Sequence, residues 1–253
     1  MSRIIAIANQ KGGVGKTTTA VNLSACLAAA EKTTLLVDID PQSNATSGCG
    51  IDLPDDAPSV YEVLLQEHPF PETVRETEVP FLSIAPSSIR LTGAEVEMVS
   101  IISRERRLES ALDSVRDDYD FIVIDCPPSL GLLTLNALTS ADSVLIPIQC
   151  EYYALEGLGK LLNTLRLVQK HLNPSLRIEG VLLTMFDGRL NLSRQVAEET
   201  RSHFGDKVYQ TVIGRNVKLG EAPSFGKPII LYDIMCPGAQ SYINLAGEVI
   251  NHG

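Results

Sequence analysis

The residues with the clearest chemical potential form a glycine-rich segment near the N-terminus, Asn9-Gln10-Lys11-Gly12-Gly13-Val14-Gly15-Lys16-Thr17-Thr18. A short apolar run precedes it and an Ala- and Leu-rich stretch follows, which is the strand–loop–helix order in which phosphate-binding loops occur. The glycines allow the backbone to curl with its N–H groups pointing inward, and the next helix adds the positive end of its dipole. The segment therefore predicts a loop that binds the phosphates of a nucleotide.

Within this loop the side chains have separate expected roles. Lys16 supplies a positive charge to the β- and γ-phosphates, and the Thr17 hydroxyl is placed to ligate Mg²⁺. The usual form of the motif is G-x-x-x-x-G-K-[ST], but Gln10 stands where its first glycine belongs. The loop is thus a deviant form of the motif in which Lys11 is a second lysine.

Carboxylates follow two further apolar runs. Asp38 and Asp40 come after residues 35–37, and Asp125 comes after residues 121–124. Ligands of an open parallel sheet bind outside the carboxyl ends of its strands, so these side chains are expected beside the phosphate loop. Asp125 is then the second Mg²⁺ anchor, acting directly or through water. Because no glutamate follows Asp125, Asp40 is the candidate to orient or deprotonate an attacking water.

Six short, mostly continuous apolar runs predict the strands that must position these groups. They cover residues 4–8, 34–37, 81–84, 121–124, 143–148 and 178–183. Continuous runs are typical of strands buried on both faces of a parallel sheet. Helical patterns alternate with them over Thr17–Ala30, Arg104–Asp117, Leu155–His171, Leu192–Phe204 and Ala239–Ile250.

This alternation predicts the fold class α/β, a doubly wound and mostly parallel sheet flanked by helices. No repeat, low-complexity tract or linker interrupts it, so residues 1–253 are expected to form a single P-loop domain. The Asp52–Pro58 stretch reads as a surface loop within that domain.

The charge of the chain is negative and uneven. There are 21 Lys and Arg residues against 31 Asp and Glu, a net charge of -10, which excludes a uniformly basic nucleic-acid binder. Residues 1–150 hold 10 basic and 21 acidic residues, whereas residues 151–253 hold 11 and 10. Side-chain charge that attracts anions is therefore expected in the second part.

The remaining composition bounds the compartment. Five widely spaced cysteines, with no C-x-x-C pair, argue against a zinc knuckle or a redox dithiol. No signal peptide is recognisable, and no apolar run approaches the roughly 20 residues of a membrane-spanning helix. We therefore expect a cytoplasmic protein of a reducing compartment.

Several of these segments together resemble the deviant-Walker-A ATPases, and among them the ParA/Soj chromosome- and plasmid-partitioning ATPases. The matching stretches are the loop Lys11–Thr18, Asp38-Ile39-Asp40-Pro41-Gln42, Ile124-Asp125-Cys126-Pro127-Pro128, Gln149-Cys150-Glu151-Tyr152-Tyr153-Ala154-Leu155-Glu156-Gly157 and Glu221-Ala222-Pro223-Ser224. The resemblance runs essentially from end to end of the chain.

The resemblance implies an ATP hydrolase that is slow and stimulated by a partner, and that uses ATP and Mg²⁺. Such ATPases form a homodimer around two ATP molecules. Lys11 would then reach the partner's phosphates, Lys16 would act in cis, and a side chain at Gly12 should block the dimer. On the adenine side the resemblance implies Asn216 and Gly214, although Gly214 replaces a proline common in relatives.

The family also implies macromolecular partners. The ATP form binds DNA without sequence preference, a centromere-binding ParB-type protein stimulates hydrolysis, and bacterial relatives act on the replication initiator DnaA. The family's basic residues map onto Arg189, Arg215 and Lys218, in the near-neutral second part of the chain, so a nucleoid-associated protein is expected. One departure bears on this patch: Ile234-Met235-Cys236-Pro237-Gly238 stands where relatives carry a basic stretch after Asp233.

Two alternatives on the same fold remain open. A MinD-like ATPase that cycles on a membrane would need a basic amphipathic C-terminal helix, whereas residues 244–253 contain no Lys or Arg, so no membrane partner is expected. A metabolic enzyme or iron–sulfur carrier is the other alternative. An iron–sulfur scaffold should show closely spaced ligand cysteines, but Cys126 and Cys150 are far apart in sequence.

Overall fold

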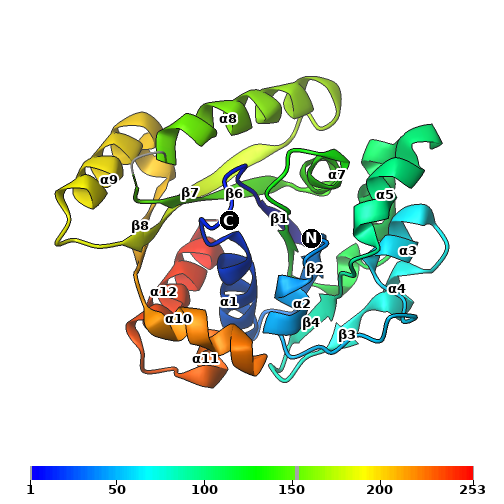
Figure 1. Cartoon of the computed structure of the whole chain (residues 1–253), viewed down its shortest axis with the longest axis horizontal. Coiled ribbons are helices and arrows are strands. Elements are labelled where there is room, and N and C mark those ends of the chain that lie inside the picture. The colour runs from blue at the N-terminus through cyan, green and yellow to red at the C-terminus, as the bar shows by residue number, and fades with distance from the viewer. Residues whose placement is uncertain (1, 152–153, 253) are drawn as a thin grey trace.

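A single eight-stranded sheet runs through the computed structural model, which describes residues 2–151 and 154–252 (Figure 1). Tyr152 and Tyr153, part of one segment that carries the family resemblance, lie outside the described residues. The strand order is β3-β4-β2-β5-β1-β6-β7-β8, and all neighbours are parallel except the antiparallel pair β3 and β4. The strands are β1 (Arg3–Ile7), β2 (Thr34–Asp38), β3 (Arg75–Glu76), β4 (Leu82–Ala85), β5 (Phe121–Asp125), β6 (Ser143–Gln149), β7 (Arg177–Phe186) and β8 (Val208–Gly214).

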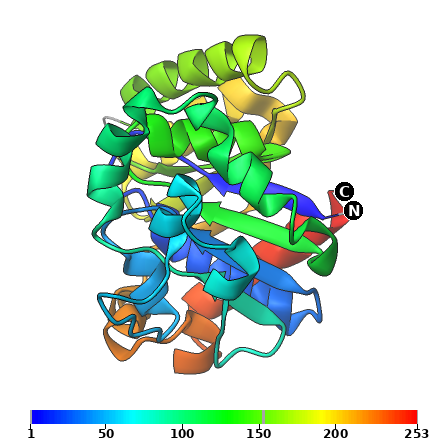
Figure 2. The same ribbon diagram turned by 90° about the vertical axis from the view of Figure 1, so that its right-hand side faces the viewer.

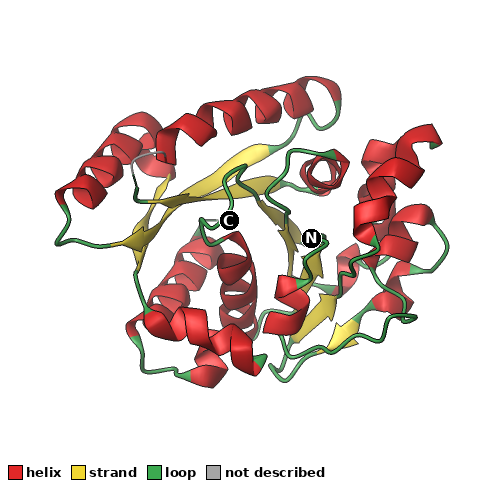
Figure 3. Ribbon diagram, viewed as in Figure 1, coloured by secondary structure: helices red, strands yellow, loops and turns green. Residues whose placement is uncertain are grey.

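Helices cover both faces of this sheet (Figure 3). They are α1 (Lys16–Ala29), α2 (Asn44–Gly48), α3 (Val60–Leu65), α4 (Phe70–Thr73), α5 (Leu91–Glu97), α6 (Arg107–Leu112), α7 (Leu132–Ser140), α8 (Ala154–His171), α9 (Asn191–Phe204), α10 (Val217–Glu221), α11 (Ile229–Tyr232) and α12 (Pro237–Asn251). The predicted doubly wound, mostly parallel α/β sheet is therefore confirmed.

Two hydrophobic cores follow from the alternation of side chains along the strands. In β1, Ile4 and Ala6 join a core with residues of α3 to α9, whereas Ile5 and Ile7 join a second core with α1, α2 and α10 to α12. Both sets are fully buried, which explains why this strand is a continuous apolar run. Figure 2 shows the resulting three layers from the side.

The register of the central strands brings the predicted site residues to one edge. Asp125, the last residue of β5, lies opposite Ile7 at the end of β1 and opposite Asp38 at the end of β2. The phosphate loop leaves the sheet at this same edge, between β1 and α1. Carboxylates separated by 87 residues in sequence thus become neighbours beside the loop.

The predicted secondary structure differs from the observed one in several places, and strand β3 and the helices α2 to α5 and α7 were not predicted. Val208–Gly214 forms strand β8, which the search for continuous apolar runs missed because this edge strand carries Gln210 and Thr211 on partly exposed positions. The helix expected over Arg104–Asp117 is broken into α6 and two single turns. Asp113, Asp117 and Asp118 would sit at the negative end of the helix dipole, which disfavours continuing it.

Two further observations complete the fold. The Asp52–Pro58 stretch is a loop, as predicted. Among the residues that the structure describes, none of the helices combines the length and the apolar character needed to cross a membrane.

Candidate nucleotide site

The backbone of the loop between β1 and α1 requires glycine at two positions. Gly13 and Gly15 have φ angles of 72° and 86°, in the left-handed region that other residues rarely adopt. Gly12 is different, because no positive φ is found there and a Cβ built on it would meet none of the described atoms within 4 Å. Neither the backbone angle nor the described neighbours of Gly12 therefore require a glycine.

Two polar side chains that the sequence analysis missed hold the loop in place. The Asn9 side chain accepts a hydrogen bond from the Lys11 N–H at 3.0 Å and donates one to the Pro147 carbonyl of β6 at 2.7 Å. From β7, the buried Thr184 hydroxyl donates to the Val14 carbonyl at 2.8 Å. Its methyl carbon would lie 3.8 Å from a Cβ at Gly15. The loop is thus attached to the sheet on both sides.

Lys16, the first residue of α1, carries an ammonium group that is largely withdrawn from water. The residue is only 6% exposed, and its Nζ donates to the Lys11 carbonyl at 3.3 Å. Burial lowers the pKa of Lys16, and the carboxylates of Asp125 and Asp40 offset part of that effect. A buried cation of this kind gains most from an anion brought into the loop.

Asp125 is a buried carboxylate without a hydrogen bond of normal geometry. Both of its oxygens are orphaned, and the residue is fully buried. Burial raises its pKa well above the usual range, the charge of Asp38 adds to the rise, and the nearby Thr17 hydroxyl offsets part of it. Two unpartnered carboxylate oxygens beside a hydroxyl fit a hard divalent cation, which Mg²⁺ sites complete with phosphate and water oxygens.

Asp38 is buried too, but its oxygens have partners. It accepts from the Thr46 N–H at 2.8 Å, from the Thr46 hydroxyl at 2.7 Å and from the Asp40 N–H at 3.1 Å. Burial still raises the pKa of Asp38 to about 6 despite these bonds. Asp38 therefore holds the loop that carries Asp40, and it was not predicted as a site residue.

Asp40 follows β2 and is also buried. Its Oδ1 accepts from the Gln42 N–H at 3.0 Å, so one oxygen serves the turn. Among the described residues no hydrogen bond engages the other oxygen, which leaves it available to a water or a substrate group.

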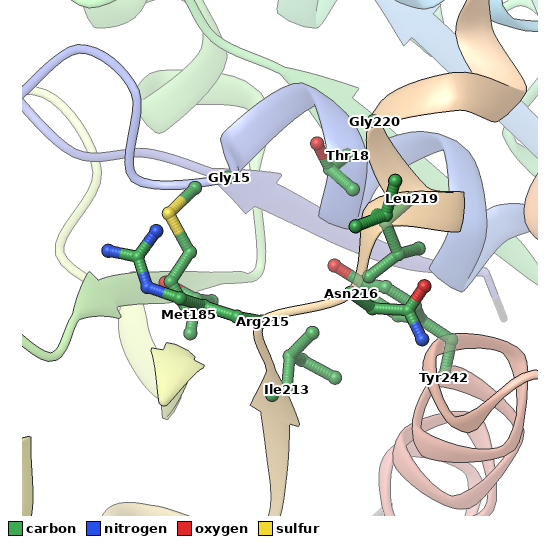
Figure 4. A pocket seen from close by; sticks show the side chains of 12 residues that line it. Gly15, Thr18, Met185, Ile213, Arg215, Asn216, Leu219, Gly220 and Tyr242 are labelled. Carbon is green, nitrogen blue, oxygen red and sulfur yellow. The ribbon is translucent and has the colours of Figure 1, made fainter. Parts of the chain in front are cut away.

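A pocket of about 420 Å³ opens beside the loop (Figure 4). The structure brings the predicted residues Gly214 and Asn216 to the same pocket as Gly15 and Thr18. The remaining lining residues are largely apolar or come from strand ends: Thr184, Met185, Ile213, Arg215, Val217, Leu219, Gly220 and Tyr242. The side-chain amide oxygen of Asn216, Oδ1, caps α10 by accepting from the Lys218 N–H at 2.8 Å. This cavity has the size and lining expected for a flat heteroaromatic base.

The three basic residues predicted to bind DNA follow the carboxyl ends of the adjacent strands β7 and β8. Each holds a carboxylate of the same chain: Arg189 with Asp187 at 2.7 Å, Arg215 with Glu151 at 2.6 Å and Lys218 with Glu221 at 3.3 Å. The Arg189 side chain is 89% exposed. Exposed ion pairs of this type contribute at most about 1 kcal/mol, so they exchange readily.

The segment that departs from the family's basic stretch is locally structured. Ile234 and Met235 are exposed, with 52% and 81% of their surface accessible. Cys236 is the N-cap of α12, and its sulfur accepts from the Ala239 N–H at 3.4 Å. The surface beside the basic residues is therefore apolar at this point.

Comparisons with known proteins agree with this geometry. A family model described as an AAA domain matches residues 2–178. The chain is 62% identical to the Bacillus subtilis sporulation initiation inhibitor protein Soj over the full length of both. It is 57% identical to the Myxococcus xanthus chromosome partitioning protein ParA, covering 99% of this chain and 88% of the relative. Among solved structures, cobyrinic acid a,c-diamide synthase from Mycobacterium smegmatis with bound ADP and magnesium is 38% identical, with a TM-score of 0.87 and coverage of 100% and 95%.

Proposed function

Since this chain belongs to the ParA/Soj family of chromosome-partitioning ATPases, we propose that it is an ATP-dependent molecular switch that hydrolyses ATP with Mg²⁺. One observation carries this proposal. At the mouth of a glycine loop lie the buried Lys16, which forms no ion pair among the described residues, and the buried Asp125, whose oxygens have no hydrogen-bond partner of normal geometry there. Nucleotide phosphates and Mg²⁺ complement both groups at once.

The roles of the residues follow from their positions. Lys16 and the N–H groups of the loop bind the phosphates, and Thr17 and Asp125 would hold Mg²⁺. The bound metal would neutralise charge that develops on the phosphate oxygens. Asp40 orients a water and accepts its proton as the water oxygen attacks the γ-phosphorus and the bond to ADP breaks. Gly214 and Asn216 contact the adenine.

A homodimer around two nucleotides is supported by the outer side of the loop. Gly12 borders open space among the described residues, so the face of the loop at this position is free for the close approach of a second copy. None of the ion pairs among the described residues involves Lys11, which could therefore turn towards the phosphates of a partner. A lysine donated in this way would act as an arginine finger does.

The dimer would bind DNA without sequence preference through Arg189, Arg215 and Lys218, which places the protein at the nucleoid. Phosphate contacts from these side chains give affinity that depends on salt. A ParB-type centromere-binding protein would stimulate the slow hydrolysis, and the replication initiator DnaA is a second candidate partner. The apolar surface of Ile234 and Met235 limits the patch, so we expect modest affinity.

The membrane-cycling alternative is less well supported. Tyr242, Leu245 and Val249 form the apolar face of α12, and all three are buried in the core that this helix shares with α1. A membrane anchor needs such a face to be exposed. The metabolic alternative rests on a relative that is 38% identical, against 62% for Soj over the full length.

A salt titration of DNA binding tests the proposal. Retention of plasmid DNA is measured from 50 to 300 mM salt with ATP, with ADP and without nucleotide. We expect retention only with ATP, falling as salt rises. Arg189→Glu should reduce it, whereas Arg166→Glu, the same charge change on the exposed side of α8, should not. Binding that ignores the nucleotide, or none at the lowest salt, would overturn the proposed switch.

A further inference from the structure

A closed ring of buried hydrogen bonds surrounds the backbone of Asp40. The Ser87 hydroxyl donates to the Asp40 carbonyl at 2.6 Å, and the Ser87 N–H donates to the Thr46 hydroxyl at 3.0 Å. The Thr46 hydroxyl in turn donates to Asp38, and Asp38 accepts from the Asp40 N–H. Four residues from β2, α2 and the turn after β4 are thereby joined.

Every member of this ring lies out of water. Ser87 is 1% exposed, Thr46 is 3% exposed and Asp38 is fully buried. Both hydroxyls of the ring donate a hydrogen bond, and the Thr46 hydroxyl also accepts one, so neither hydroxyl is left without a hydrogen-bond partner. Buried networks that are fully satisfied rigidify the backbone they hold.

The ring fixes the residue whose carboxylate is proposed to act on water. Asp40 is held at its N–H by Asp38 and at its carbonyl by Ser87, so both peptide groups that flank its Cα have fixed directions. The side chain then needs only two torsions to reach its final position. Misplacement of a reacting group by about 1 Å can cost on the order of 100-fold in rate.

We propose that Ser87 is a positioning residue for ATP hydrolysis, acting through the backbone of Asp40. This inference rests on the proposed function, in which Asp40 orients the attacking water. Ser87 follows strand β4 and does not line the pocket assigned to the base, so we expect little effect of Ser87 on ATP affinity. Its effect should fall on turnover.

The test measures release of labelled phosphate and the affinity for a fluorescent ATP analogue. Ser87→Ala should lower kcat by about 10- to 100-fold and change nucleotide affinity by less than about twofold. Ser87→Thr, which keeps the hydroxyl, should recover part of the rate. Ser140→Ala removes another buried hydroxyl, one that bonds only within α7, and should leave both quantities unchanged.

A double-mutant cycle with Asp40→Ala separates positioning from general damage. Asp40→Ala alone should bind ATP and lower turnover to a small residual rate. If Ser87 acts through Asp40, adding Ser87→Ala to that variant should not lower the residual rate further. A normal rate in Ser87→Ala, or a further loss in the double variant, overturns the inference while the proposed function stands.

A normal rate in Asp40→Ala overturns the role of Asp40 itself and the inference with it. Should Ser87→Ala fail to fold, Ser87→Cys, which keeps the volume and weakens the donor, must show the same split between kcat and affinity.

Discussion

Replacement of Asp125 by Asn should make the metal-free protein more stable at neutral pH while it weakens the binding of Mg²⁺ and ATP. The ionised carboxylate is buried without hydrogen bonds and beside Asp38, so folding opposes its charge. An amide of the same shape carries no charge. The difference in the free energy of unfolding between the variant and the parent therefore measures how much the buried charge of Asp125 destabilises the folded protein.

The sign and size of the effect follow from linkage. Because the folded pKa of Asp125 is raised, the folded state holds a proton that the unfolded chain has lost above about pH 4, so stability falls as pH rises. Asp38, which faces Asp125 on the neighbouring strand, shows the same direction, since burial raises its pKa to about 6 despite three hydrogen bonds. Where the folded state keeps a proton that the unfolded chain has lost, the parent loses stability relative to the variant by up to about 1.4 kcal/mol per pH unit.

Urea unfolding followed by circular dichroism from pH 4 to pH 8, without Mg²⁺ or nucleotide, checks this expectation. Parent and Asp125→Asn should be similar at pH 4, and the advantage of the variant should then grow with pH up to pH 8, by at most about 1.4 kcal/mol per pH unit. Asp113→Asn, on the surface of the protein, should show no such growing difference. Saturating Mg²⁺ and ATP should stabilise the parent much more than the variant. A difference that stays constant with pH would refute the assignment of Asp125 as a strained buried acid.

Two further changes test the loop and its surroundings. Lys16→Ala should abolish ATP binding in calorimetry without lowering the stability of the nucleotide-free protein, because the ammonium is buried at a cost; retained affinity would remove Lys16 from phosphate binding. Gly226→Ala should lower Tm by about 5 °C, since Gly226 has a φ of 62° and its new Cβ would lie 2.9 Å from the Gly50 Cα. Gly220→Ala, whose Cβ would meet nothing within 4 Å, is the control, and equal losses in the two variants would contradict the packing argument.

The parts of the fold that could be predicted from the sequence are those that depend on a pattern of neighbouring residues within one strand or helix. The continuous apolar runs predicted β1, β2 and the four other long internal strands because a strand buried on both faces needs apolar residues at every position. Strand β8, Val208–Gly214, was not predicted because an edge strand tolerates polar residues and so shows no continuous apolar run. Its presence matters, since Gly214 and Asn216 owe their place in the pocket to it.

The site divides in the same way. Lys16, Thr17 and Gly15 belong to one contiguous motif, and Asp40 and Asp125 come at or just after the end of an apolar strand, so short-range spacing was enough to propose them as site residues. Thr184 and Ser87 act through contacts across 170 and 47 residues of sequence, and a lone threonine or serine near a strand end is common. Only the three-dimensional structure shows that their hydroxyls meet the loop and the backbone of Asp40.

The ion pairs that follow β7 and β8 affect the free energy with which their basic side chains would exchange a carboxylate of the same chain for a phosphate of a nucleic acid. Arg189, Arg215 and Lys218 each carry a tethered counter-ion in the form of a carboxylate of the same chain. When mobile ions leave a polyanion, their release into solution gains entropy and drives binding. A tethered carboxylate gains no such translational freedom when a phosphate displaces it. Each contact would therefore gain entropy only from the ions that leave the nucleic acid, and it would lose the ion pair within the chain. Affinity would then depend on several contacts forming together, as they would if two copies of the chain presented their surfaces side by side.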